Sequence, residues 1–230
     1  MNIKRISNVI KKEWEMQRGK PMDVTNKLLE VSTKSGADLF GVADANDFSS
    51  YVDKHNPFFY DDNAKSVIVI GYHISDPILA VWIPSIDGKP YRSFINEILG
   101  NIALEIISIL LKEGKRTVLS PYNGIFAKDA AVLAGLGTIG KNNLLLTKQF
   151  GSRVRLRTII TEAELSVNAR LQESFCGDCP HLCWSACPAG AFATGKFNRN
   201  ACVKYSDEHI IKLSDNCNLG CRECELACPK

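Results

Sequence analysis

The sequence predicts an α+β protein, in which an α/β sheet domain precedes a small cysteine-rich module. Two observations carry this prediction. Expected strands and helices alternate irregularly over residues 23–165, and all nine cysteines lie between Cys176 and Cys228. Because the composition changes sharply near residue 170, we expect two domains, residues 1–170 and residues 171–230.

The expected elements of the first domain follow from capping residues and hydrophobic patterns. Residues 1–22 are expected to form a short helix or arm. A capped amphipathic helix and a short strand come next, and the β-branched run VIVI is typical of a buried strand. The expected ranges are helices at 23–36, 93–113 and 126–135, strands at 37–44, 65–74, 116–120 and 152–165, and a proline-rich loop at 74–92.

Composition and charge narrow the class of protein. Hydrophobic residues make up 45% of the chain and charged residues 23%, which is typical of a globular protein. The net charge of +3 is too small to indicate a nucleic-acid-binding surface. No apolar run approaches the roughly 20 residues that span a bilayer, and the N-terminus lacks the apolar core of a signal peptide. We therefore expect a cytoplasmic protein without a membrane partner.

The spacing of the cysteines predicts iron–sulfur clusters. One run, C-x2-C-x3-C-x3-C-P, starts at Cys176, and a second, C-x3-C-x2-C-x3-C-P, starts at Cys217. In two-cluster ferredoxins the cysteine before proline ligates the other cluster. Zinc sites instead prefer paired C-x2-C units, and an odd number of cysteines fits a disulfide framework poorly. The sequence thus predicts a ferredoxin-like module with two [4Fe–4S] clusters.

Two such clusters need eight thiolates, so one of the nine cysteines is spare. The preferred assignment leaves Cys217 spare, and the alternative uses Cys217 in place of Cys202. In the preferred assignment, the first cluster binds Cys176, Cys179, Cys183 and Cys228. The second cluster binds Cys187, Cys202, Cys221 and Cys224. The first run is one residue longer in the middle than the usual spacing, and Pro180 marks where this residue could be accommodated.

A glycine-rich segment, GLGTIGKN at residues 135–142, lies just after an expected helix. It fits the dinucleotide fingerprint G-x-G-x-x-G, and it nearly fits the phosphate-binding pattern G-x4-G-K-[ST]. Both patterns need a preceding strand, and Asn142 replaces the hydroxyl residue, so neither interpretation holds. Two interpretations stay open. The glycines form a helix C-cap with a tight turn, or they let the backbone approach a large flat ligand.

Three arginines, Arg153, Arg155 and Arg157, alternate along the expected strand at 152–165. Alternation places them on one face of the sheet, with apolar and Thr side chains on the other. This pattern favours a solvated face. The alternative is a basic surface for a phosphate, a cofactor tail or RNA.

Two segments resemble the signature of the epoxyqueuosine reductase family, which is related to the reductive dehalogenases. They are KDAAVLAGLGTIGKNNLLLT at residues 128–147 and FGS at residues 150–152. The cysteine runs and ACVKY at residues 201–205 support the resemblance. The resemblance implies a nitroreductase-like, cobalamin-binding domain that is fused to the two-cluster module. It also implies an electron donor such as a flavodoxin, a ferredoxin or a reductase. The expected cobalamin contacts are Asn123, Gly135, Leu136, Gly137, Gly140, Lys141 and Asn142.

The sequence also departs from that family. Its members carry an acidic proton donor before this helix, whereas residues 120–127 here contain no Asp or Glu. The candidate proton donors are Tyr122, Lys128 and Asp129. Since the C-terminal helical repeats linked to tRNA recognition do not follow Cys228, we expect a small-molecule or corrinoid-protein substrate rather than tRNA.

The resemblance implies a cobalamin-dependent iron–sulfur reductase. The alternative is an electron-transfer or corrinoid-reducing protein without substrate chemistry of its own. A further alternative replaces cobalamin with FMN.

Overall fold

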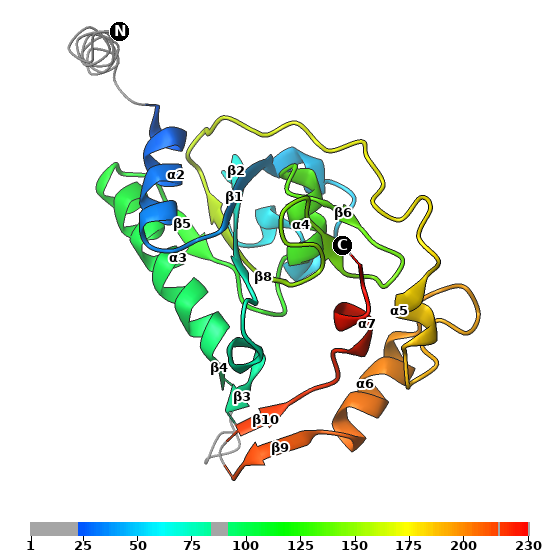
Figure 1. Ribbon diagram of the computed structural model, residues 1–230. Helices are drawn as coiled ribbons and strands as arrows, with labels where there is room; N and C mark the ends of the chain where they lie inside the picture. Colours follow the sequence, from blue (N-terminus) through cyan, green and yellow to red (C-terminus); the bar gives the residue numbers. More distant parts are fainter. Residues whose placement is uncertain (1–22, 84–91, 216, 230) are drawn as a thin grey trace, which may run out of the picture.

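The computed structural model describes residues 23–83, 92–215 and 217–229 (Figure 1). The arm expected at 1–22 lies outside these residues. The main sheet has the strand order β1-β2-β8-β5, and every neighbouring pair is antiparallel. Its strands are β1 (Leu39–Asp44), β2 (Ser66–His73), β5 (Thr117–Leu119) and β8 (Val154–Thr161). The long pairing of β2 with β8 places the VIVI run at the centre of the sheet, where all four side chains are buried.

Helices cover both faces of this sheet. Helices α2 (Val24–Lys34) and α3 (Phe94–Lys112) pack on one face, in a core that includes Leu28, Ile68 and Leu99. Helix α4 (Ala127–Leu133) and the 3₁₀ turn η1 (Ala45–Phe48) pack on the other face. This arrangement matches the α+β class that the irregular alternation predicts.

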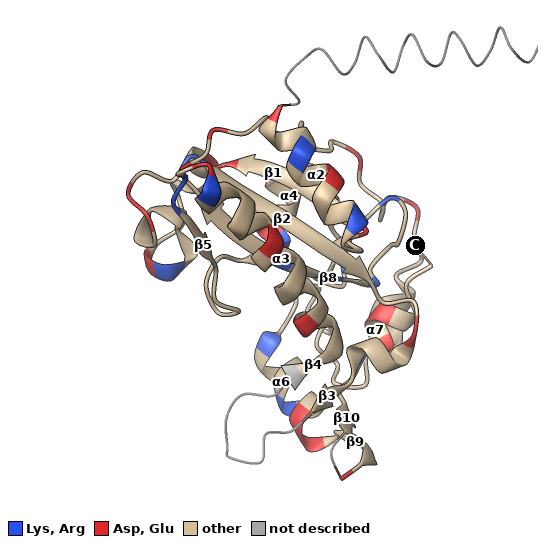
Figure 2. Ribbon diagram, turned by 90° about the vertical axis from the view of Figure 1, so that its left-hand side faces the viewer, with Lys and Arg blue, Asp and Glu red and all other residues tan. Residues whose placement is uncertain are grey.

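Helix α3 is the one described helix that is long and apolar enough to cross a membrane by length and composition. The expectation that no apolar run approaches that length is therefore wrong. Its buried face, with Ile95, Ile102 and Ile106, packs against the sheet, as expected of a core helix. Figure 2 shows basic and acidic residues interspersed along α2 and α3, in keeping with the small net charge.

A second sheet, with the order β4-β3-β10-β9, joins segments that are far apart in the sequence. Strand β3 (Trp82–Ile83) comes from the segment expected to be a loop, and β4 (Arg92–Ser93) lies where that loop was expected to meet the helix at 93–113. Strands β9 (Ile211–Ser214) and β10 (Cys217–Leu219) come from the cysteine-rich segment. Hydrogen bonds therefore cross the boundary expected near residue 170, and the division into two domains stays a prediction.

The remaining elements are short. A hairpin, β6 (Thr138–Ile139) with β7 (Leu145–Leu146), follows α4. The cysteine-rich segment contains α5 (Leu182–Ser185), α6 (Arg199–Glu208) and α7 (Glu223–Leu226), on the side of the molecule away from α3 (Figure 1). Three more 3₁₀ turns are η2 (Asp53–His55), η3 (Pro57–Phe59) and η4 (Pro77–Ala80).

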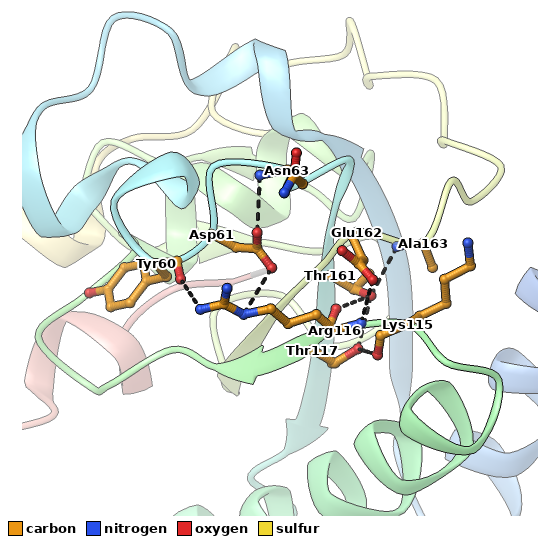
Figure 3. Close-up of polar contacts among 9 residues, drawn as sticks. All are labelled: Tyr60, Asp61, Asn63, Lys115, Arg116, Thr117, Thr161, Glu162 and Ala163. Atoms are coloured by element: carbon orange, nitrogen blue, oxygen red, sulfur yellow. Dashed lines mark hydrogen bonds and ion pairs between the residues drawn. The ribbon is translucent and has the colours of Figure 1, made fainter.

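A polar network holds β5 against the loop before β2 (Figure 3). The buried Asp61 carboxylate accepts a hydrogen bond from the Asn63 N–H at 3.0 Å, and Arg116 Nε lies 3.4 Å from its second oxygen. Arg116 also donates from its backbone N–H to the Glu162 carboxylate at 2.8 Å. The Asp61 charge is thus neutralised by one guanidinium at the sheet edge.

Replacing Arg116 with Ala should lower the free energy of unfolding by about 1 kcal/mol, because Asp61 loses its counter-ion. The effect stays modest because the Arg116 side chain is 63% exposed and solvent screens the pair. Urea denaturation measures it, with Lys115→Ala as the control, since Lys115 is the exposed neighbouring cation. A variant R116A as stable as K115A would contradict this role.

Candidate cofactor and cluster site

Two cavities meet at the start of α4. Their volumes are 640 Å³ and 790 Å³, within the range of roughly 300–1,000 Å³ typical of ligand sites. Both are lined by Tyr122, Ala127 and Lys128. The start of α4, in the segment with the family-like signature, therefore lies at the junction of the two cavities.

The first cavity has mostly apolar walls. Leu144, Leu145 and the β8 residues Val154 and Leu156 line it, together with Trp82. Its polar groups come from Asn96, Tyr122, Lys128, Ser152 and Arg155. Apolar walls with a few polar groups are what a large, flat organic cofactor needs.

The second cavity is rich in cations. Lys54, Lys128 and Arg199 line it beside His55, and Asp129 is its one acidic lining residue. The Tyr51 hydroxyl donates to the Asp129 carboxylate at 3.0 Å, and burial followed by this bond raises the pKa of Tyr51 to about 12. The His55 ring stacks on Phe126 with centroids 3.8 Å apart. Of the expected cofactor contacts, Asn123 lines this cavity.

Two of the candidate proton donors line both cavities. The Lys128 ammonium donates to the Asn143 carbonyl, and burial lowers the pKa of Lys128. The Tyr122 hydroxyl donates to the Asn96 carbonyl at 3.2 Å, and burial raises the pKa of Tyr122. Since a raised pKa keeps the phenol protonated, Tyr122 retains a proton to give at neutral pH. Asp129, the third candidate, lines only the second cavity of the two.

The Arg157 guanidinium lies under the Tyr122 ring, 3.9 Å from its centroid. Arg157 is buried, its Nε has no hydrogen-bond partner, and burial lowers its pKa. Arg155 lies 3.4 Å from the buried Glu225 carboxylate of α7. The prediction that this face of β8 is solvated is therefore wrong at Arg157. The ring of Tyr122, which is far away in the sequence, covers the Arg157 side chain and makes a cation–π contact with it.

All nine cysteines are free thiols. Their charge interactions separate them into sets. The pKa of Cys183 is raised by burial and then by the thiolates of Cys228, Cys179 and Cys176. The pKa of Cys224 is raised to about 12 by burial, then by Cys187, Cys202 and Cys221, and least by Cys183 of the first set. Thiolates interact in this way only when they lie close together.

Apart from the small effect of Cys183 on Cys224, the two sets contain the same cysteines as the preferred assignment, which stays a prediction. Cys217 contributes to neither and lies in β10, opposite Ser214 of β9. Among the described residues, no three His, Cys, Asp or Glu side chains converge as ligands of a single metal ion. A cubane cluster does not need such convergence, since its ligands bind four separate iron corners.

Two glycines of the glycine-rich segment lie so close to backbone carbonyl groups that a side chain would not fit. Gly135 has φ +68°, and a Cβ there would lie 2.3 Å from the Ala169 carbonyl oxygen. A Cβ on Gly137 would lie 2.3 Å from the Leu146 carbonyl oxygen. These contacts match the interpretation as a helix C-cap and tight turn.

The segment does not itself line the two cavities. The residues immediately after it, Asn143, Leu144 and Leu145, do so instead. Cofactor contact by Gly135, Leu136, Gly137, Gly140, Lys141 and Asn142 therefore stays a prediction. Ala127 and Lys128, in the first turn of α4, line both cavities. Nothing in the sequence of this helix predicts that its first turn lies at the junction of two cavities.

Comparison with known proteins gives a consistent result. No family model matches the chain. The epoxyqueuosine reductase of Listeria monocytogenes is 35% identical over 111 residues, which are 44% of this chain and 29% of that protein. The epoxyqueuosine reductase of Vibrio cholerae is 30% identical over 166 residues, which are 68% of this chain and 44% of that protein. The chain thus spans less than half the length of these two curated relatives.

Solved structures share the fold. A crystal structure of epoxyqueuosine reductase aligns with a TM-score of 0.68 and 22% identity, over 89% of this chain and 64% of that one. A catabolic reductive dehalogenase aligns with a TM-score of 0.69 and 18% identity, over 92% of this chain and 33% of that one. The chain is therefore an epoxyqueuosine reductase-like protein, with the mixed helix and sheet fold of those reductases and of the reductive dehalogenases.

Proposed function

We propose that the chain is an iron–sulfur reductase that holds two [4Fe–4S] clusters and a cobalamin. When bound, the clusters would supply electrons from a flavodoxin, ferredoxin or reductase, and the cobalamin would supply a strongly reducing cobalt centre. One observation carries the proposal. Ser152 and Arg155 line the first cavity, and both contact Glu225, the residue next to Cys224: Ser152 Oγ donates to the Glu225 carbonyl at 3.2 Å, and Arg155 lies 3.4 Å from the Glu225 carboxylate.

The residues present fit these groups. Each cluster has four thiols to hold it, in the two sets given above. The first cavity has apolar walls for the faces of a corrin ring, and Asn96, Ser152 and Arg155 offer hydrogen bonds to its amide side chains.

The chain's own residues would supply the proton that a reductive step consumes. Lys128 and Tyr122 are the two candidate donors common to both cavities. Arg157 holds the Tyr122 ring from below, and the Asn96 carbonyl orients its hydroxyl. Asp129 carries a carboxylate already engaged by Tyr51, so its role would be to attract the Lys128 ammonium.

The proposal is tested on the full chain, reconstituted anaerobically with iron and sulfide and titrated with hydroxocobalamin. About eight irons per chain and a saturable change in the visible spectrum would support it. About eight irons with no spectral change would overturn the cobalamin site and favour the electron-transfer alternative, with FMN tested next. A chain that retains no iron would overturn the whole proposal.

The substrate is tested with two probes. One solved relative is an epoxyqueuosine reductase with an epoxyqueuosine-modified tRNA stem loop, and another is a dehalogenase in complex with 3-bromo-4-hydroxybenzoic acid. The first complex keeps tRNA as a candidate beside the small-molecule substrate that we expect. Reduction of neither probe in a single turnover would favour the electron-transfer alternative.

Replacing Lys128 with Met should slow single-turnover reduction of the accepted probe by about 10²-fold or more, the usual contribution of a general acid. Burial lowers the pKa of Lys128, so the wild-type rate should fall as pH rises through a value below the usual lysine pKa of about 10.4. The rate of K128M should not show this decrease at high pH. Exposed Lys65 provides the control K65M, and an unchanged K128M rate would exclude Lys128 as the donor.

A further inference from the structure

One short turn contacts both cysteine runs. The backbone N–H of Lys141 donates to Cys176 Sγ at 3.4 Å, and its carbonyl accepts from Trp184 Nε1 at 2.9 Å. The next side chain, Asn142, donates through Nδ2 to the Cys224 carbonyl at 3.3 Å. Cys176 and Cys224 belong to different thiol sets, so two adjacent residues touch both.

The Lys141 side chain makes a further contact in the first run, with His181 Nε2. His181 has φ +58°, a left-handed conformation that few residues other than glycine adopt. It lies between Cys179 and Cys183, in the part of the run that is one residue longer than usual. The lengthened part of the run therefore turns at His181, next to Pro180. In this conformation the His181 ring contacts the Lys141 side chain.

The turn is held in place from the side of the main sheet. The Asn142 side chain is buried, and its Oδ1 accepts the Leu144 N–H at 3.1 Å. A Cβ on Gly140 would lie 2.7 Å from the Leu146 side chain, so the hairpin packs tightly at this point. The turn is thus packed against the body that carries the cavities.

We propose that Lys141 and Asn142 act as a clamp, which positions both clusters against the cavity-bearing body and favours reduction of the cluster bound by Cys176. This inference rests on the proposed function, because it needs the two clusters. A backbone N–H bond to a ligating sulfur and a nearby ammonium both stabilise the more negative, reduced cluster. Lys141 is therefore a positioning residue that also sets a redox potential.

The test compares Lys141→Met with Lys148→Met, a control that removes an exposed cation from the same body. Both variants are reconstituted as the full chain, and the midpoint potential of each cluster is measured by an EPR-monitored titration. In K141M the midpoint potential of the cluster bound by Cys176 should fall and that of the other cluster should stay unchanged. About eight irons should be retained. K148M should change neither. Two unchanged potentials in K141M, or an equal shift in K148M, would overturn the clamp.

A second variant tests the same contact without removing a charge from the body. His181→Gly suits the left-handed backbone and deletes the ring that Lys141 contacts. Hydrogen exchange of the α5 amides should become about tenfold faster in both H181G and K141M, as the loss of one hydrogen bond predicts. Unchanged exchange in both variants would overturn the clamp. Absence of iron in the wild-type chain would instead contradict the proposed function, so the two failures are distinguishable.

Discussion

Replacing Cys224 with Ala should remove one cluster and lower the iron content of the reconstituted chain from about eight to about four atoms. Cys224 is held among Cys187, Cys202 and Cys221, and burial raises its pKa to about 12 in the absence of metal. A thiol so buried ionises when iron replaces its proton. Without it, the remaining three thiols leave one iron corner without a protein ligand. Iron analysis and the EPR spectrum of the reduced protein measure the loss.

Cys217→Ala is the matched control for C224A, because it removes a cysteine from the same run. Cys217 stands outside both thiol sets, so C217A should keep about eight irons. An unchanged iron content in C224A would contradict the ligand assignment. If C217A loses a cluster while Cys202→Ala keeps both, the alternative assignment, with Cys202 spare, is correct.

Much of the fold could be predicted because its strongest elements have local signals. The VIVI run of β2 is β-branched and flanked by polar residues, so its burial follows from its own sequence. Gly135 follows α4 with a positive φ, as the sequence predicts. The predicted cap at Asp23 is wrong, because its side chain makes no capping bond to α2 and instead accepts a hydrogen bond from the Ser166 hydroxyl at 3.1 Å. The ligand sets inferred from the cysteine spacing stay a prediction, which the iron content of C224A and C217A tests.

The features that were missed depend on contacts between distant segments. Strand β10 pairs with β3 through Asn218 and Trp82, and neither short segment has a strand pattern of its own. Arg157 is buried because Tyr122 covers it, which the alternation of β8 cannot reveal. The role of Lys141 depends in the same way on Cys176 and His181, both far away in the sequence. Sequence periodicity reports which face of an element is apolar, but not which residue covers a polar side chain.

Replacing Ala127 with Trp should weaken hydroxocobalamin binding at least about tenfold, because the new ring would fill the junction of the two cavities. Ala127 is half-buried in the first turn of α4 and lines both cavities. The residues by which α4 packs on the sheet are Ala130, Ala131 and Ala134, one to two turns further along. The substitution should therefore leave the core of the body intact. The visible spectrum during a titration with hydroxocobalamin measures the affinity.

The control is Leu104→Trp, which adds the same ring on the exposed side of α3, 57% exposed and on the far face of the sheet from α4. L104W should bind hydroxocobalamin like the wild type. A127W should retain about eight irons, because Ala127 is not a cluster ligand. Normal cobalamin affinity in A127W would place the cofactor outside these cavities. Loss of affinity together with full iron content would separate the cobalamin site from the cluster sites, since one substitution would then disable binding at the cavities and leave both thiol sets loaded.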